Sequence, residues 1–206
     1  MTTNPSAPEL TSRGPADHAV RDQIIAAAHN YFAHYGYEKT TVADLARAIG
    51  FSKAYIYRFF ESKQAIGEAI CLNTTGKLFE TVKAAVDTGQ TATEKMRLFT
   101  GTVTAAGLDL LFNEQKLHAI AAHASTEKWP SAKVYTDRLK QLIETIVKEG
   151  RESGEFERKT PLDETTRAIF FAMMPFIKPI FLEHSQDILP RAQQDVTALI
   201  LRSLAP

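Results

Sequence analysis

Basic and aromatic side chains gather between residues 47 and 63, and together they could bind a nucleic acid. This segment holds four Lys or Arg residues, five aromatic residues and a single acidic one, Glu61. Lysine and arginine pair with phosphate oxygens, and arginine can also donate two hydrogen bonds to the edge of a guanine. The segment therefore concentrates groups that suit DNA, and the elements that hold them decide whether they can act together.

The residues around the start of this segment predict a short amphipathic helix at 42–49. Thr41 can cap its first turn, and Asp44 three residues later resembles a capping box, in which side chains satisfy free backbone N–H groups. Gly50 follows, where a left-handed residue commonly ends a helix. The apolar residues fall on one face, at Val42, Leu45, Ala46 and Ile49.

A second short helix is expected after Gly50, and it should turn basic and aromatic residues outward. Ser52 can cap this helix, while Ile56 and Phe60 are one turn apart and should point inward. The other faces carry Lys53, Ala54, Tyr55, Tyr57 and Arg58. Two helices joined by a tight turn, the second displaying polar groups, form a DNA-binding helix-turn-helix. The alternative is a solvated amphipathic pair in an all-helical core, which the outward aromatic residues disfavour.

Three runs of residues around this motif resemble the N-terminal domain of the TetR family of bacterial repressors. They are Gly36 to Val42, Ile49 to Ala54 and Ile56 to Lys63. The resemblance implies a DNA-binding head joined to a larger helical domain that receives an input, with a double-stranded DNA operator as partner. This sequence departs from the family pattern at Tyr55, where a small Thr or Ser is common, and at Phe59, where His is common.

Nine residues are therefore predicted to contact DNA. The resemblance assigns Tyr57 and Lys63 to the phosphate backbone, with Thr40 or Thr41 contacting it from the start of the preceding helix. Arg58 could pair with a guanine edge, and Tyr55 could contact a thymine methyl group or a phosphate. The complete set is Thr40, Thr41, Ser52, Lys53, Ala54, Tyr55, Tyr57, Arg58 and Lys63.

A net charge of zero, from 24 basic and 24 acidic residues, does not exclude DNA binding. Phosphate affinity depends on charges within about 8 Å, the Debye length at physiological salt, and these concentrate at 47–63. A patch this small predicts binding by two subunits. The 206 residues include no apolar run of the ~18 residues that a membrane span needs and no signal peptide, so we expect a cytoplasmic protein without membrane contact.

Helical periodicity interrupted by glycine and proline predicts an all-α chain of about nine helices. Beyond the two motif helices, the expected spans are 17–35, 62–86, 92–111, 114–125, 130–153, 162–184 and 188–204. Three parts are expected along the chain. They are a flexible N-terminal arm at 1–15, a three-helix helix-turn-helix domain at 16–62, and a helical effector-binding and dimerisation domain at 63–206.

One C-terminal segment, residues 168–182, is apolar on every side. Its only charge is Lys178, and Pro175 and Pro179 make the segment too broken to span a bilayer. A helix without a polar face has to be covered all round. It is either the central helix of a monomer or part of a contact with a second copy. The TetR resemblance favours a homodimer formed through the last two long helices, about 162–204.

Catalytic and metal-binding chemistry find little support, so no catalytic residue, metal or cofactor is predicted. His118 and His123 are five residues apart, which is about 140° around a helix, so they cannot easily chelate one metal ion. The single cysteine, Cys71, cannot form an internal disulfide and is expected to be a small buried hydrophobic residue.

The C-terminal domain contains enough aromatic and methionine side chains to line a pocket for a small, largely apolar effector. The candidates are Phe99, Phe112, His118, Trp129, Tyr135, Phe171, Met174 and Phe181. Together with the family resemblance, they predict a ligand-responsive dimeric repressor that its effector releases from a palindromic operator. The alternative is an all-helical binding or scaffold protein that does not read DNA.

Overall fold

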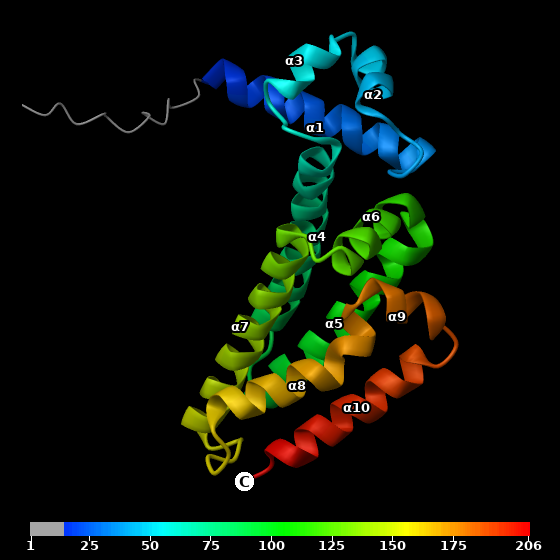
Figure 1. Ribbon diagram of the computed structural model, residues 1–206. Helices are drawn as coiled ribbons and strands as arrows, with labels where there is room; N and C mark the ends of the chain where they lie inside the picture. Colours follow the sequence, from blue (N-terminus) through cyan, green and yellow to red (C-terminus); the bar gives the residue numbers. More distant parts are fainter. Residues whose placement is uncertain (1–14) are drawn as a thin grey trace, which may run out of the picture.

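A computed structural model describes residues 15–206 of the chain (Figure 1). Within this range all regular elements are helices, which confirms the all-α prediction. The ten helices are α1 (Pro15–Tyr35), α2 (Val42–Ile49), α3 (Lys53–Tyr57), α4 (Lys63–Asp87), α5 (Ala92–Asn113), α6 (Gln115–Thr126), α7 (Pro130–Ser153), α8 (Leu162–Ile177), α9 (Pro179–His184) and α10 (Leu189–Leu204). The arm predicted at 1–15 lies outside the described residues, apart from Pro15, which begins α1.

The single helix predicted at 162–184 is two helices in the structure, α8 and α9, which raises the described count from nine to ten. The break falls at Lys178, whose backbone is extended, with φ −82° and ψ 124°. A residue before proline is disfavoured in the helical region because the proline Cδ crowds it, and Pro179 follows directly. Pro175, by contrast, lies inside α8 without ending it.

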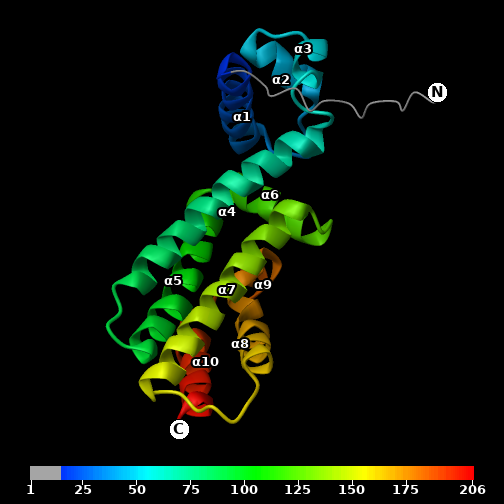
Figure 2. The same cartoon turned by 90° about the vertical axis from the view of Figure 1, so that its left-hand side faces the viewer.

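The helices form a small head and a larger body, connected by α4. Helices α1, α2 and α3 lie together at one end of the molecule, and α4 runs from the head along the body beside α7 (Figure 1, Figure 2). Helices α8 and α10 lie next to each other at the far end of the body. The motif helices are thus held away from the segment predicted to form a dimer.

Buried apolar side chains form two clusters, one in the head and one in the body. The head cluster contains Ile24, Leu45 and Ile56 from α1, α2 and α3, but it also includes Leu117 and Ile120 from α6. The body cluster brings together side chains of α4, α5, α7, α8, α9 and α10. Helix α6 follows α5 of the body in the sequence, but its side chains complete the core of the head. The head and the body are therefore packed together through α6.

Local capping contacts set the helices of the head where the sequence predicts them. The Thr41 hydroxyl accepts from the Asp44 N–H and the Asp44 carboxylate accepts from the Thr41 N–H, each at 3.1 Å, which confirms the capping box. Gly50 ends α2 in the left-handed region, with φ 73°. The Ser52 hydroxyl accepts from the Tyr55 N–H at 3.1 Å and so begins α3. The turn between α2 and α3 is therefore fixed by short-range contacts.

A close-packed junction joins head and body at Gly67 of α4. A Cβ atom at this position would lie 2.9 Å from a ring atom of Tyr37 and 2.9 Å from a ring atom of Trp129. These two rings meet edge to face, with their centroids 5.5 Å apart. On the same side, the Lys63 ammonium group donates to the Tyr37 carbonyl oxygen at 3.1 Å and lies over the Tyr37 ring. Glycine lets α4 pass this close to both rings.

We predict that Gly67→Ala lowers the free energy of unfolding by about 1–3 kcal/mol, because the added methyl group overlaps two buried rings. Gly76→Ala is the matched control, since it lies in the same helix and a Cβ there meets nothing within 4 Å. That variant should gain roughly 0.5–1 kcal/mol from the better helix propensity of alanine. Urea unfolding measures both, and equal stabilisation of the two variants would contradict the packing at Gly67.

Candidate nucleic-acid interface and effector cavity

Helix α3 lies at the end of the head (Figure 1), and its exposed side carries cationic and phenolic side chains. The exposed residues are Lys53, Ala54, Tyr57 and Arg58. Ile56 and Phe60 face the core, as predicted, and are 0% and 3% exposed. The Lys53 ammonium nitrogen lies 5.7 Å from the centre of the Tyr57 ring, so both belong to one surface. A phosphate backbone could contact this surface without any change in the core.

The two residues that depart from the family pattern are packed against their neighbours. Phe59 is buried, and Tyr55 is half-buried with its ring between those of Phe51 and Phe59. The centroid of the Tyr55 ring lies 5.0 Å from that of Phe51 and 5.3 Å from that of Phe59. Tyr55 therefore helps to hold α3 in place, and its contact with a base or phosphate stays a prediction.

Thr40 and Thr41 have different surroundings, although either was expected to contact the DNA backbone. Thr41 is exposed, and its hydroxyl takes part in the capping box. Thr40 is 2% exposed, and its hydroxyl donates to the Gly36 carbonyl oxygen at 2.8 Å. The structure departs from the prediction at Thr40, because its hydroxyl satisfies a carbonyl just past the end of α1 and does not reach the surface.

The other predicted contacts have partners within the head. Ser52 is exposed and caps α3. Lys63 is half-buried, and its bond to Tyr37 uses one of the three N–H donors of the ammonium group, which leaves two for a phosphate. The Arg58 guanidinium lies 3.8 Å from the Asp17 carboxylate of α1, with both side chains partly exposed. Such a pair contributes little stability, so Arg58 can exchange Asp17 for DNA at small cost.

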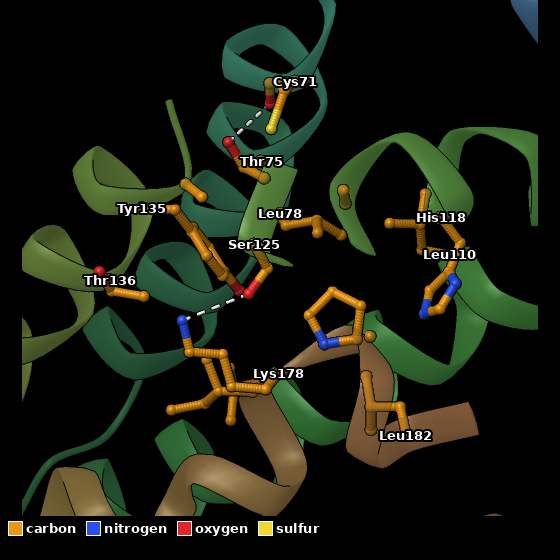
Figure 3. A pocket seen from close by; sticks show the side chains of 16 residues that line it. Cys71, Thr75, Leu78, Leu110, His118, Ser125, Tyr135, Thr136, Lys178 and Leu182 are labelled. Atoms are coloured by element: carbon orange, nitrogen blue, oxygen red, sulfur yellow. Dashed lines mark hydrogen bonds between the residues drawn. The ribbon is translucent and has the colours of Figure 1, made fainter. Parts of the chain in front are cut away.

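A cavity lies in the body between α4, α5, α6, α7 and the α8–α9 break (Figure 3). Its empty volume is about 550 Å³, including the part open to solvent, but the centre of a water molecule has only about 40 Å³ in which to move. The walls are mostly apolar. The residues with polar side-chain groups are Cys71, Thr75, His118, Ser125, Tyr135, Thr136 and Lys178. In this conformation the cavity is narrow, so a ligand of more than a few atoms requires its walls to move.

Two of the eight residues predicted to line a pocket, His118 and Tyr135, lie in this lining, and six do not. The six fall into three groups by location. Phe99 and Trp129 are buried in the body and head clusters, Met174 packs against the body cluster, and Phe112, Phe171 and Phe181 are exposed. The structure does not bring these six to this cavity, because an aromatic or methionine side chain suits a core, a pocket and an interface alike, and the sequence does not separate them.

Burial favours the uncharged forms of three titratable groups of the cavity, His118, Tyr135 and Cys71. Burial is the main cause that lowers the pKa of His118, against the opposing effects of the Glu183 carboxylate and the Pro179 carbonyl. Burial likewise raises the pKa of Tyr135 and that of the Cys71 thiol. A neutral imidazole, a phenol and a thiol give the cavity hydrogen-bonding groups without charge.

Lys178 and Ser125 line the cavity but are not among the pocket residues predicted from the sequence. A signal for Lys178 was present, because it is the only charge in the apolar segment 168–182 and precedes a proline that breaks the helix. Ser125 gave no comparable signal. Within residues 15–206, no three His, Cys, Asp or Glu side chains cluster so that they could hold a metal ion. Among the helices described, none combines the length and apolarity that a membrane crossing requires.

Two family models match the chain. Residues 24–70 match the model of bacterial regulatory proteins of the tetR family, and residues 92–199 match that of the tetracyclin repressor-like C-terminal domain. The second match alone covers more than half of the chain. The boundary between them falls in α4 and the turn after it, so the head and most of the body each correspond to one model.

The chain is also similar to named proteins. It is 41% identical over 60 residues to the HTH-type transcriptional repressor Rv1474c of Mycobacterium tuberculosis, covering 29% of this chain and about a third (32%) of that repressor. It is 28% identical over 165 residues to the nucleoid occlusion factor SlmA of Mannheimia succiniciproducens, covering 73% of this chain and 69% of that factor. The transcriptional regulator FadR of Bacillus subtilis, solved in complex with stearoyl-CoA, has the same fold, with a TM-score of 0.65, 21% identity, and coverage of 89% and 98%.

We predict that Arg58→Ala weakens binding to the best DNA site by about 1–3 kcal/mol and relaxes the preference at one base pair in each half-site. The arginine is exposed and its pair with Asp17 is a surface contact, so folding should be unaffected. Selection from a random DNA pool, with the wild type in parallel, measures the consensus. An unchanged consensus would show that Arg58 does not read a base.

Lys63→Ala should weaken specific and non-specific DNA binding alike and reduce the dependence of affinity on salt, because phosphate contacts carry little sequence information. Lys148→Ala, at an exposed lysine of α7 in the body, is the control and should change neither. Because Lys63 also contacts Tyr37, helicity is checked by circular dichroism before titration. Full affinity together with an altered sequence preference would refute the phosphate role.

Proposed function

Because the chain belongs to the TetR family of bacterial regulatory proteins, we propose that it is a dimeric transcriptional repressor that a small, largely apolar effector releases from a palindromic DNA operator. The observation that carries this proposal is the capped α2–α3 turn, which presents Lys53, Tyr57 and Arg58 on one surface of the head. Repression, rather than activation, is supported by the similarity of 60 residues of the chain to a protein named as a repressor.

The surface of α8 supports a dimer. Its outer side carries an exposed apolar stripe at helical spacing, made of Ala168, Phe171, Ala172 and Pro175. Phe171 is 61% exposed, and Leu199 on the neighbouring α10 is 58% exposed. Water is a poor environment for a stripe of this kind, and a two-fold contact lets one surface cover its own copy. We therefore assign the second copy of this chain as the partner of α8 and α10.

A dimer also suits the modest charge of the head. One head presents few cations to DNA, but two heads related by a two-fold axis can bind two half-sites one or more helical turns apart. Once one head is bound, the second head is held at a high effective concentration near its half-site, so the dimer binds more tightly than either head alone. The operator is accordingly a palindrome whose half-site spacing matches the distance between the two copies of α3.

The cavity supports control by an effector. It is narrow, and α6 forms one of its walls while also packing against α1 in the head. A molecule that enters the cavity has to displace a wall, and displacement of α6 alters how the head sits on the body. The effector lowers DNA affinity by as much as it prefers the displaced conformation. The stearoyl-CoA complex of the similar FadR supports an effector with a large apolar part.

A mobility-shift titration against the DNA that flanks the protein's own gene tests DNA binding directly. A helical scaffold protein that does not read DNA would give no sequence-dependent shift at any salt concentration. A shift that competitor DNA of random sequence fails to abolish supports a specific operator. The same fragment, shortened stepwise, locates the palindrome.

We predict that Phe171→Glu converts the dimer into folded monomers, because the added carboxylate would lie within an apolar interface. Phe112→Glu is the matched control, since Phe112 is similarly exposed (55%) but lies at the end of α5 rather than on α8. Phe176 is unsuitable, because it is 2% exposed and a charge there should unfold the body. Sedimentation measures the mass, and an unaltered Phe171→Glu dimer that still binds the palindrome would refute this interface.

A further inference from the structure

Lys178 is a half-buried cation in the wall of the cavity. It occupies the break between α8 and α9, where the extended backbone before Pro179 carries the side chain towards α6 (Figure 3). Its ammonium nitrogen lies 3.5 Å from the Ser125 hydroxyl oxygen, which is a long hydrogen bond. Among the residues that the structure describes, none forms an ion pair with Lys178. Within residues 15–206, its close polar partner is a neutral hydroxyl.

The charges around Lys178 leave its ammonium group uncompensated. Burial lowers the pKa of Lys178, and the positive charge of Lys140 lowers it further. In the part of the chain that the structure describes, no carboxylate opposes these two effects. A cation that is partly withdrawn from water loses part of its hydration, so the site gains free energy when an anionic group pairs with it.

The rest of the cavity suits an apolar molecule. Leu78 of α4, Val103 and Leu110 of α5, and Leu182 of α9 form much of the wall. A guest that filled this space without a charged end would leave Lys178 unpaired. A guest that was charged throughout could not displace water from the leucine side chains. The lining therefore fits a molecule with an apolar body and one anionic end.

His118 is a second polar position in the same lining. It is 1% exposed, and its Nδ1 lies 3.1 Å from a Glu183 carboxylate oxygen. A carboxylate only accepts hydrogen bonds, so the Nδ1 that faces Glu183 is the nitrogen placed to donate to it. Within the described residues this buried Nε2 has no hydrogen-bond partner. Buried polar atoms usually have a hydrogen-bond partner, so Nε2 is available to a molecule in the cavity.

We propose that the effector is an amphipathic carboxylic acid whose carboxylate pairs with Lys178 and Ser125 while its apolar body lies along the leucine side chains of the cavity. This inference rests on the proposed function, since it names the chemical class of the effector in the same cavity. Lys178 then acts as the residue that selects an acid over a neutral lipid of equal length. A hydroxyl group on the body of the acid could hydrogen-bond to Nε2 of His118.

Calorimetric titration of the full chain with octanoate, octanol and octylamine tests this selection. The three probes share one alkyl chain and differ in the charge of the head group. We expect octanoate to bind at least about tenfold more tightly than octanol, as a hydrogen bond between charged groups provides. Octylamine should not bind measurably, because it would bring a second cation next to Lys178. An apolar cavity without an anion site would instead favour octanol, since a carboxylate is the costlier group to dehydrate.

Lys178→Met, which keeps the length of the side chain and removes its charge, should abolish the preference for octanoate and leave octanol binding intact. Lys133→Met, at an exposed lysine of α7 outside the cavity, is the control and should keep the preference. The melting temperature of Lys178→Met should not fall below that of the wild type, because the variant removes an unpaired, half-buried charge. If that variant does not fold, Lys178→Gln takes its place with the same expected result.

Two outcomes would overturn the inference. One is that octanoate binds no better than octanol to the wild type, and the other is that its preference survives in the Lys178 variant. Because calorimetry needs no DNA, a parallel mobility shift separates this result from the proposed function. DNA binding without a preference for octanoate refutes the carboxylate assignment alone. A preference for octanoate in a protein that binds no DNA refutes the repressor role and leaves the cavity chemistry standing.

Discussion

The packing of α6 against the head is the constraint on which the rest of this structure depends. Leu117, Ile120 and Ala124 of α6 belong to the same apolar cluster as the cores of α1 and α2. The head therefore has no closed core of its own. Any movement of α6 exposes apolar surface unless the head moves with it, and burial of such surface is worth roughly 25 cal/mol per Å².

The cavity lies on the adjoining face of that same helix. His118 and Ser125 each follow directly after a head-facing residue and line the cavity instead. Cores are close-packed and resist continuous deformation, so a helix held between two packed surfaces is better shifted as a unit than bent. In the proposed function, occupancy of this small internal space would therefore be passed through α6 to α1 and so to the head that carries α3.

The elements that depend on neighbours in sequence could be predicted, and those that depend on distant contacts could not. Thr41, Gly50 and Ser52 act through bonds to residues a few positions away, and all three lie where the sequence places them. The pocket is different, because it is formed by residues from Cys71 to Leu182 that only the tertiary structure brings together. Thr40 illustrates the same limit. Its hydroxyl donates to the Gly36 carbonyl oxygen, and the residue type alone does not reveal this hydrogen bond.

The junction at Gly67 also gives the molecule an optical reporter of its own. Trp129 is the only tryptophan of the chain, and it lies 4% exposed between the rings of Tyr37 and His123, with centroids 5.5 and 5.2 Å away. Indole emission depends on the polarity and the quenching groups around the ring. All tryptophan fluorescence of the chain therefore comes from the place where the head meets the body. A rearrangement of this junction should change that fluorescence, so no attached dye is needed to follow it.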